Sequence, residues 1–179
     1  CMNVFLLTQP DAFYIPKLLD RFMTEKPDEA RVVGAAVLKG EIAASNVMDY
    51  LRLLGIRGTL VNGFEFARYK LLDVVDRIAG VRGVYSVRGL LRKWDISEHT
   101  PENINSESFH QLLQKLEVDL VISVACPQIV RQDLLELPSE GVINIHGALL
   151  PKYRGKLPSF WVLAHGETKT GVTVHYMNE

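Results

Sequence analysis

Residues 120–146 read LVISVACPQIVRQDLLELPSEGVINIH and contain the pattern that decides the fold. The run Leu120–Val124 is almost wholly apolar, which is typical of a strand buried on both faces of a parallel sheet. A short helical turn over Leu134–Leu137 ends before Pro138, and Val142–Ile145 is the next apolar strand. A strand, a helical turn and a second strand in this order indicate a unit of an α/β sheet.

The same alternation continues on both sides of this unit. Further strands are predicted over Met2–Leu7, Val32–Leu38, Thr59–Val61 and Gly171–Met177. Helices are predicted over Phe13–Met23, Val47–Leu54 with Ser45 as its cap and Gly55 as its stop, Phe66–Ala79 ending at Gly80, Ser106–Leu116 and Ser159–His165. The polar stretch Asp95–Asn105 is predicted to be a loop. Together these elements predict one α/β domain over residues 1–179, with a doubly wound, mostly parallel sheet.

The composition narrows the class of protein. The chain has 179 residues, of which 47% are hydrophobic and 23% charged, and its net charge is -1. No run approaches the roughly 20 apolar residues that span a membrane, so we expect no membrane partner and a cytoplasmic location. A net charge near zero argues against a nucleic-acid partner, which usually meets a basic face. The two cysteines give no disulfide framework.

Asn144 and His146 are the first candidates for catalysis. Residues two apart on a strand point the same way, so an amide donor and an imidazole lie side by side where this strand ends. Such a pair can stabilise an oxyanion and move a proton near neutral pH. A buried strand with one hydrogen-bonded histidine would show the same two residues, and the pair alone does not separate these interpretations.

The flanking motifs resemble those of the 10-formyltetrahydrofolate-dependent formyltransferases. The resemblance rests on Asn144-Ile-His146, on Leu149-Leu-Pro-Lys-Tyr-Arg-Gly155 and on Gly166-Glu-Thr-Lys-Thr-Gly-Val-Thr-Val-His-Tyr-Met177, and it is dense over residues 118–177. That family includes glycinamide ribonucleotide, methionyl-tRNA and nucleotide-sugar formyltransferases. The resemblance implies a Rossmann-like fold and 10-formyltetrahydrofolate as co-substrate, with no metal.

The resemblance also implies roles for the strand residues. Asn144 would donate its amide to the oxyanion, and His146 would assist it and handle the proton. The family's third catalytic residue, an Asp, is expected about three residues beyond Glu179 and is absent from this sequence. We therefore expect the chain to be an N-terminal catalytic domain truncated at its C-terminal end, with little or no activity as it stands.

Two loops are implied to bind substrates. The folate would lie against Cys126, Pro127, Gln128, Ile129 and Val130, largely through main-chain groups and an apolar wall. The acceptor would contact Lys152, Tyr153 and Arg154, after a Leu150–Pro151 bond that we expect to be cis. Thr8, at the end of the first strand, is a further candidate for an acceptor phosphate, although the glycine that relatives often carry there is missing.

The cysteine and the other histidines are expected to have structural rather than catalytic roles. Cys126 is expected to be buried and inert rather than nucleophilic. His165 and His175 are expected to be structural, and His99 and His110 to be exposed. No spacing among the histidines and cysteines suggests a metal site.

The motifs most closely resemble those of nucleotide-sugar formyltransferases, so a small-molecule amine, an amino-sugar nucleotide, is the expected acceptor. Methionyl-tRNA is the alternative, although the charge does not favour tRNA. Two other classes stay open: a hydrolase that releases formate from 10-formyltetrahydrofolate, and a folate-binding domain without catalysis. The sequence does not indicate the oligomeric state.

Overall fold

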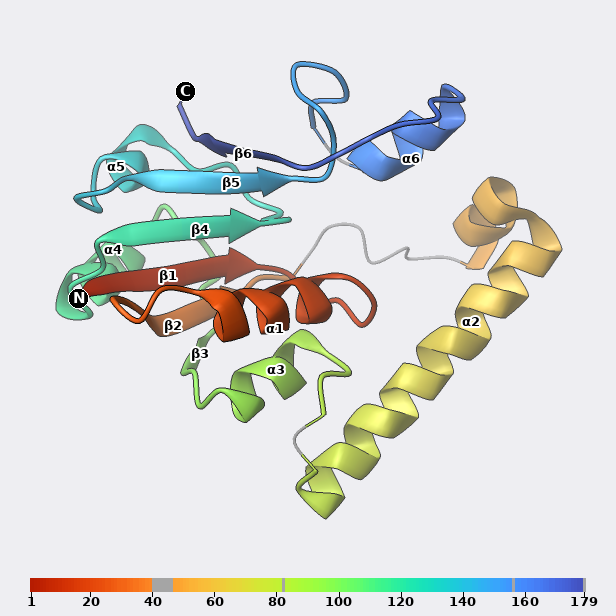
Figure 1. Cartoon of the computed structure of the whole chain (residues 1–179), viewed down its shortest axis with the longest axis horizontal. Helices are drawn as coiled ribbons and strands as arrows, with labels where there is room; N and C mark the ends of the chain where they lie inside the picture. The colour runs from red at the N-terminus through yellow and green to blue at the C-terminus, as the bar shows by residue number, and fades with distance from the viewer. Residues whose placement is uncertain (40–46, 82, 156, 179) are drawn as a thin grey trace.

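The computed structural model describes residues 1–39, 47–81, 83–155 and 157–178, and within them six strands form one sheet (Figure 1). The order across the sheet is β3-β2-β1-β4-β5-β6. The strands are β1 (Met2–Thr8), β2 (Ala30–Val37), β3 (Glu98–His99), β4 (Leu120–Val124), β5 (Val142–His146) and β6 (Thr173–Tyr176). The helices are α1 (Ile15–Glu25), α2 (Val47–Ala79), α3 (Val87–Lys93), α4 (Glu107–Lys115), α5 (Gln132–Leu135) and α6 (Pro158–Ala164).

The sheet is doubly wound, as the sequence predicts. The pairs β1–β2, β1–β4, β2–β3 and β4–β5 are parallel, and β6 alone runs antiparallel to its neighbour β5. The chain starts in the middle of the sheet and adds strands first on one side of β1 and then on the other. The carboxyl ends of β1, β4 and β5 therefore meet at one edge, where sheets of this kind bind their ligands.

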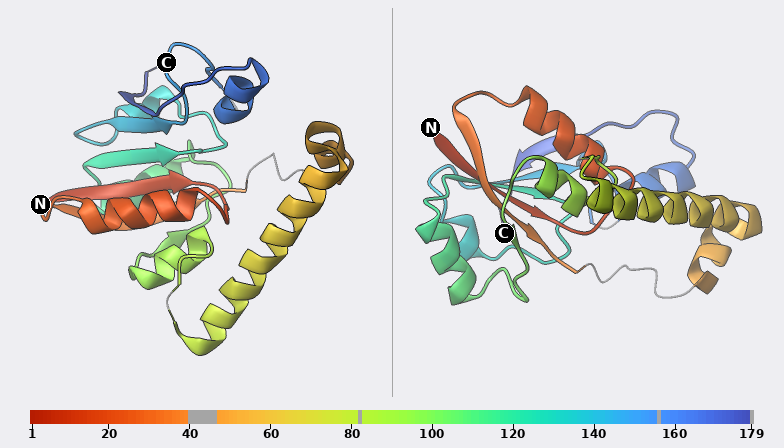
Figure 2. Two further views of the ribbon diagram at one scale, coloured as in Figure 1. Left: turned by 45° about the vertical axis from the view of Figure 1, so that its right-hand side comes forward. Right: turned by 90° about the horizontal axis from the view of Figure 1, so that it is seen from below.

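Residues of β1 explain why its sequence is continuously apolar. Val4 and Leu6 pack in one core with residues of α1 and α3. Phe5 and Leu7 point to the other face and pack in a second core with residues of α4 and α5. Helices thus cover both faces of the sheet (Figure 2), and neither face of a central strand is left for polar residues.

Residues 56–79 differ from the prediction. The strand predicted over Thr59–Val61 is wrong, because these residues are helical and belong to α2. Gly55 ends the first helical piece as predicted, with a positive φ of 66°, and the chain then returns to helix as far as Ala79. The β-branched residues favour a strand locally, but an apolar period of three to four residues through Ile78 overrides them. Ser45 lies outside the described residues.

Two elements around residues 86–99 were not predicted. Helix α3 is short, and the Ser86 hydroxyl caps it by accepting a hydrogen bond from the Gly89 N–H at 2.9 Å. The predicted loop Asp95–Asn105 contains the two-residue strand β3, which pairs with Ala35 and Ala36 of β2. Both elements are too brief for a periodic pattern to reveal, since seven residues make only two helical turns.

Helix α2 lies apart from the layered core. It slants along one side of the molecule and approaches the body near its C-terminal end, beside α3 (Figures 1 and 2). None of the helices within the described ranges is both long enough and apolar enough to cross a membrane. The position of α2 leaves most of its length in contact with solvent.

Candidate active site

Asn144 and His146 lie on one face of β5, and both are half-buried. Asn144 is paired with His175 across the antiparallel β5–β6 ladder, with 3.4 Å between its Nδ2 and His175 Nε2. The other nitrogen of His175, Nδ1, lies 2.9 Å from the Tyr176 carbonyl oxygen. A carbonyl can only accept, so Nδ1–H donates to it, and Nε2 is left to accept from the Asn144 amide. His175 thus orients Asn144.

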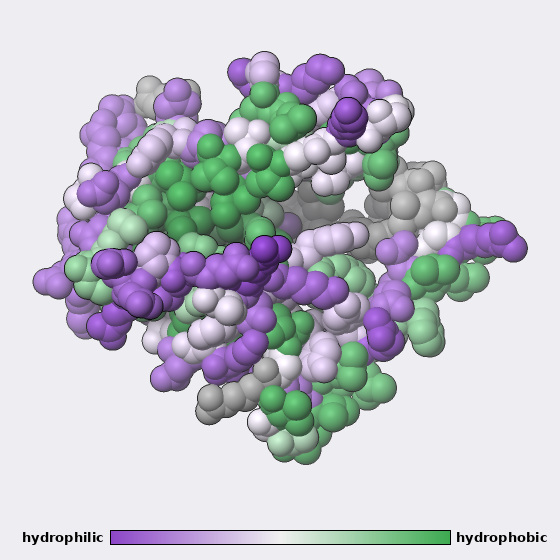
Figure 3. Space-filling view, in the orientation of Figure 1, coloured by the Kyte–Doolittle hydropathy of each residue, from purple (hydrophilic) through white to green (hydrophobic). Residues whose placement is uncertain are grey.

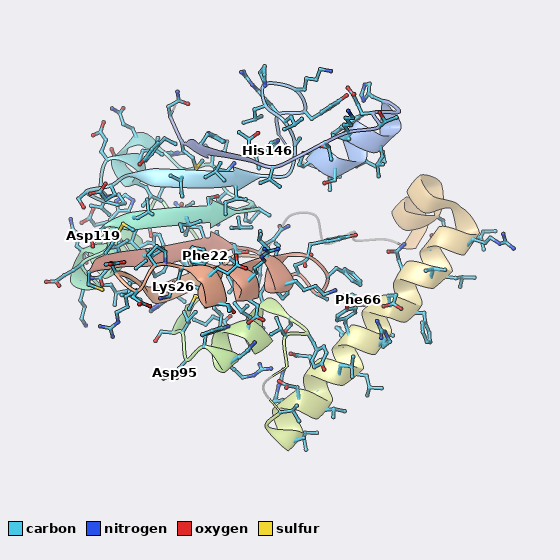
Figure 4. The ribbon with its side chains drawn as sticks, in the orientation of Figure 1. Phe22, Lys26, Phe66, Asp95, Asp119 and His146 are labelled. Carbon is cyan, nitrogen blue, oxygen red and sulfur yellow. The ribbon has the colours of Figure 1, made fainter. Side chains whose placement is uncertain are left out.

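The His146 ring is fixed by the loop that follows its strand. Nε2 lies 2.8 Å from the carbonyl oxygen of Tyr153, so Nε2–H is the donor in this contact. In the neutral ring the lone pair is then on Nδ1, which becomes the atom able to accept a proton. Figure 4 shows His146 at the end of β5, on the side where the parallel strands end.

The loop after β5 is attached to β6 through Thr173. The Thr173 hydroxyl accepts a hydrogen bond from Leu150 N–H at 3.1 Å and donates one to the Ala148 carbonyl at 2.8 Å. The expected cis bond between Leu150 and Pro151 is present, and Tyr153 has a positive φ of 56°. These features turn the chain sharply enough to bring the Tyr153 carbonyl back to the histidine.

Glu167 organises the side chains of this loop, and the sequence analysis did not identify it. Its carboxylate accepts hydrogen bonds from Lys152 Nζ at 3.0 Å and from the Tyr153 hydroxyl at 2.8 Å. Those two hydrogen bonds and the lysine charge lower the pKa of Glu167, and the same contacts raise the pKa values of Lys152 and Tyr153. Arg154 is exposed beside them. The segment Gly166-Glu-Thr belongs to one of the motifs that resemble the formyltransferases, and this motif could have pointed to Glu167.

The loop after β4 lies next to the end of β5. The Gln128 side chain is used structurally: it accepts from the backbone N–H of Ile104 at 2.9 Å and donates to the carbonyl of residue 102 at 2.8 Å. Val130 is buried in the core, whereas Ile129 is 83% exposed. Of the side chains expected to wall the folate, Ile129 is therefore the one that is open to a ligand.

Cys126 and Pro127 begin this loop, and Cys126 is partly buried. Burial raises the pKa of the Cys126 thiol and outweighs its contact with the Gln128 carbonyl, 3.5 Å away. A thiol with a raised pKa is a poor nucleophile near neutral pH. This agrees with the structural role expected from the sequence.

Thr8 ends β1, two strands away from β5 in the sheet order. It is 1% exposed, and its hydroxyl has no hydrogen-bond partner among the described residues. Neighbouring strands lie about 4.8 Å apart, so the strand ends that carry Thr8 and His146 are separated by roughly 10 Å. Thr8, the loop after β4 and the Asn144–His146 pair thus occupy one edge of the sheet.

Two histidine predictions are wrong. His110 is buried, and His99 is partly buried, with the Nε2 atom of each shielded from solvent. His110 follows the core residue Phe109 on the inward face of α4. His99 lies on the edge strand β3, where its ring packs beside that of Phe5, with 5.8 Å between the ring centroids. His165 is the residue after α6 rather than within it, and its Nδ1 bonds to the Trp161 carbonyl at 2.8 Å. No group of three or more metal-binding side chains was found in the described part of the chain.

A pocket that the sequence did not indicate lies at the carboxyl ends of β1 and β2. Its volume is about 280 Å³, and its walls come from the loop after β1 and from α2 and α3. The lining includes three cations, three aromatic rings and two carboxylates: Lys70, Arg77, Arg88, Phe66, Tyr69, Tyr85, Asp11 and Asp73. Figure 4 shows Phe66 on α2, beyond the ends of the strands.

Both carboxylates of the pocket are engaged by the protein. Asp11 accepts the backbone N–H groups at the start of α1. Asp73 accepts from the Ser86 hydroxyl at 2.7 Å and from Arg92 at 3.0 Å. Burial alone would raise the pKa of Asp73, but these hydrogen bonds and the charges of Arg92 and Arg77 hold it below its ordinary value. Two of the three cations are engaged as well, Arg77 by Asp73 at 3.5 Å and Arg88 by Glu98 at 2.8 Å. Lys70 has no ion pair with another described residue and is the cation of the pocket most suited to an anionic ligand.

Comparison with known proteins identifies the family. A family model described as formyl transferase matches residues 81–179, which is more than half of the chain. The chain belongs to the formyl transferase family. Methionyl-tRNA formyltransferase from Staphylococcus aureus (strain Newman) is 42% identical over 126 residues, which are 66% of this chain and 40% of that protein. The enzyme of the same name from Syntrophus aciditrophicus is 46% identical over 79 residues, 44% of this chain and 25% of that protein.

Solved structures of formyltransferases share the fold. Glycinamide ribonucleotide transformylase 1 from Geobacillus kaustophilus superposes with a TM-score of 0.59 at 15% identity, covering 99% of this chain and 75% of that one. A sugar N-formyltransferase from a Shewanella species superposes with a TM-score of 0.52 at 16% identity, covering 99% of this chain and 52% of that one. This formyl transferase chain spans less than half the length of the two methionyl-tRNA enzymes it matches.

Proposed function

We propose that this chain forms the formyl-transferring domain of an N-formyltransferase, which moves a formyl group from 10-formyltetrahydrofolate to a primary amine. The observation that carries the proposal is the pair of Asn144 and His146, each oriented by its own hydrogen bond, beside the loop after β4. In the proposed arrangement the folate lies against residues 126–130, with Ile129 as its apolar wall. Membership of the formyl transferase family supports the same reaction.

The proposed reaction needs one donor and one base. The amine nitrogen attacks the formyl carbon, a new C–N bond forms, and the carbonyl oxygen becomes an oxyanion. Asn144 Nδ2 donates to that oxyanion. Nδ1 of His146 takes the proton that the amine loses and returns it to the folate nitrogen as the bond between that nitrogen and the formyl carbon breaks.

For the acceptor we propose an amino-sugar nucleotide. The pocket at the ends of β1 and β2 supports this choice, because Lys70 can pair with a phosphate, Arg77 and Arg88 add positive charge to the wall, and the rings of Tyr69 and Tyr85 can stack on a base. Thr8 lies at the end of the same strand β1, between this pocket and β5. On the other side of the site, Lys152, Tyr153 and Arg154 would bind the part of the acceptor that carries the amine.

Methionyl-tRNA is the second candidate acceptor. It is favoured by the names of the relatives with 42% and 46% identity, both of which are methionyl-tRNA formyltransferases. The net charge of -1 gives the chain no general attraction for tRNA. The two candidates differ in their salt dependence, because a tRNA that contacts several cations loses affinity steeply as salt is raised.

The test is a formyl-transfer assay with 10-formyltetrahydrofolate, supplied with amino-sugar nucleotides, with methionyl-tRNA or with no acceptor. Folate binding is measured in parallel for the unsubstituted chain, for Asn144→Ala and His146→Ala, and for His165→Ala as the matched control at the edge of the site. The proposal is supported if all chains bind folate and only Asn144→Ala and His146→Ala lose turnover. Equal turnover in all chains overturns the site, and formate release without acceptor indicates a hydrolase. Folate binding without even a low turnover in the unsubstituted chain indicates a binding domain.

A further inference from the structure

Two loops of the protein are joined to each other beside the candidate site. One follows β4 and includes residues 126–131, which lie outside any helix or strand and contain the proposed folate contacts. The other, residues 100–105, leads into α4. Ile104 of one loop and Val130 of the other are buried in the same apolar core. The two loops therefore share a common base, although they are well separated in the sequence.

Above this base, two side-chain amides connect the loops. Asn105 Nδ2 donates to the Ile129 carbonyl at 2.9 Å, and its Oδ1 accepts from the Arg131 N–H at 2.9 Å. Gln128 binds the main chain of the other loop in return, through the two hydrogen bonds described above. Turning either amide over would set donor against donor and acceptor against acceptor, so only one arrangement satisfies all four contacts. We call this arrangement the amide clamp.

The amide clamp holds one side of the loop after β4 and leaves the other side free. The carbonyl of Ile129 is turned toward Asn105, whereas the Ile129 side chain is 83% exposed. The backbone N–H groups of Gln128, Ile129 and Val130 form no hydrogen bond to any other described residue. An apolar side chain beside unpaired main-chain donors is what the proposed contact with the folate requires.

The exposure of Ile129 is informative only because its main chain is fixed. A single exposed apolar side chain is ordinary on a protein surface, and others of this protein gather along α2 at the edge of the molecule (Figure 3). Ile129 differs from them because Asn105 binds the main chain at Ile129 and again two residues later. It also lies in the loop after β4, the strand that pairs with β5.

We propose that Asn105 is a positioning residue for the folate: together with Gln128, it holds residues 126–131 in the binding conformation before the ligand arrives. This inference rests on the proposed function, because it takes the loop after β4 as the folate site. A loop without helix or strand loses affinity in proportion to the time it spends in other conformations. The amide clamp removes that loss, and Asn105 does so through main-chain groups rather than by touching the ligand.

The test is isothermal titration calorimetry of the 179-residue chain with 5-formyltetrahydrofolate, a stable isomer of the proposed co-substrate. Asn105→Ala removes two contacts of the amide clamp without adding a charge. It should weaken binding about tenfold, the order expected when two hydrogen bonds that hold a binding conformation are lost. Gln128→Ala, which removes the other two contacts, should change the affinity in the same direction.

Asn62→Ala is the matched control. It also removes an amide that donates to a backbone carbonyl, that of Gly58 at 2.8 Å, but this amide lies on α2. Its affinity for 5-formyltetrahydrofolate should equal that of the unsubstituted chain. Circular dichroism at the temperature of the titration should show that every variant is folded.

Two further measurements separate positioning from a merely structural role. Deuterium exchange within residues 126–131 should become faster in Asn105→Ala, because the Arg131 N–H loses its acceptor, while the amides of β4 stay protected. In the formyl-transfer assay, KM for 10-formyltetrahydrofolate should rise and KM for the acceptor should not.

The outcomes distinguish this inference from the proposed function. If the unsubstituted chain binds 5-formyltetrahydrofolate and Asn105→Ala binds it equally well, the inference is overturned and the proposed function stands. A lower Tm for Asn105→Ala with unchanged affinity gives Asn105 a structural role only, which also overturns the inference. If the unsubstituted chain does not bind, the proposed folate site is wrong, and the inference fails with it.

Discussion

Replacement of Asp20 by Ala tests how α1 and α3 are held together beneath the pocket. The carboxylate accepts a hydrogen bond from Trp94 Nε1 at 2.7 Å and two from Lys93 Nζ, at 2.8 and 3.0 Å. Asp20 belongs to α1, Lys93 ends α3, and Trp94 follows it. One side chain therefore connects two helices that cover the same face of the sheet.

The loss in free energy of unfolding expected for Asp20→Ala depends on how exposed Asp20, Lys93 and Trp94 are. The charge-assisted bond to the partly buried indole contributes about 1.5 kcal/mol. The Lys93 and Asp20 side chains are 33% and 26% exposed, so the screened ion pair adds about 0.5 kcal/mol. We expect Asp20→Ala to lower the free energy of unfolding by about 2 kcal/mol, which lowers Tm by roughly 4–8 °C in a chain of this size. Asp20→Asn keeps an acceptor for Trp94 and should lose about half as much.

The effect should also depend on pH. Burial by itself would raise the pKa of Asp20, but the hydrogen bonds from Lys93 and Trp94 and the lysine charge bring it below its ordinary value of 3.8. Because the folded-state pKa is the lower one, the stabilisation is complete above the unfolded-state pKa and is lost as the pH falls through the folded-state pKa. Thermal melts followed by circular dichroism from about pH 7 to about pH 2 measure it.

Two results would refute this reasoning. One is Asp20→Ala melting no lower than Asp20→Asn at pH 7, which would mean that the indole contact contributes nothing. The other is a difference in Tm between the unsubstituted chain and Asp20→Ala that stays constant into acid. In that case the stabilisation would not come from the ionised carboxylate.

Three further predictions concern the site. Glu167→Gln should bring the raised pKa of Tyr153 back toward 10.0, because the Tyr153 hydroxyl loses its charged acceptor. Ultraviolet titration of the tyrosines measures this change, and an unchanged titration would mean that the contact is absent in solution. Iodoacetamide should modify the exposed Cys1 before Cys126, because burial raises the pKa of the Cys126 thiol. Peptide mass spectrometry reports the order of modification, and equal rates for the two cysteines would contradict the burial of Cys126. Asn144→Ala should lower turnover by about 10²–10³. It should change Tm little, because the Asn144 side chain is only half-buried and makes a single hydrogen bond, to His175 at 3.4 Å. A large loss of stability would argue for a structural role instead.

The central part of the fold was predictable because burial there leaves a clear pattern. Residues 120–124 are covered on both faces, so their sequence is nearly all apolar, and a helical turn and a second strand follow within a short span. The same argument holds for β1. The antiparallel direction of β6 was not predictable, because the alternation of residues along a strand is the same in either direction.

The candidate site was predictable where it depends on neighbours in sequence. Asn144 and His146 share a face because they are two residues apart on one strand. The contact between Glu167 and Tyr153 joins residues in different loops, and its geometry depends on how the chain turns after β5. The burial of His110 was available from the pattern, since it precedes the core residue Leu113 by one helical turn.

The way in which α2 is attached gives the molecule two levels of stability. The sheet is held by two apolar cores. Residues 56–79 contact the body through the carboxylates Asp73 and Asp76 and through the ring of Tyr69, which meets Phe13 and Tyr85. Ion pairs of this kind weaken as salt is added, and apolar cores do not. Helix α2 should therefore open as a separate unit, with amides that exchange with deuterium sooner in high salt while those of β1 and β4 remain protected. A melting curve that follows the sheet would not register this opening.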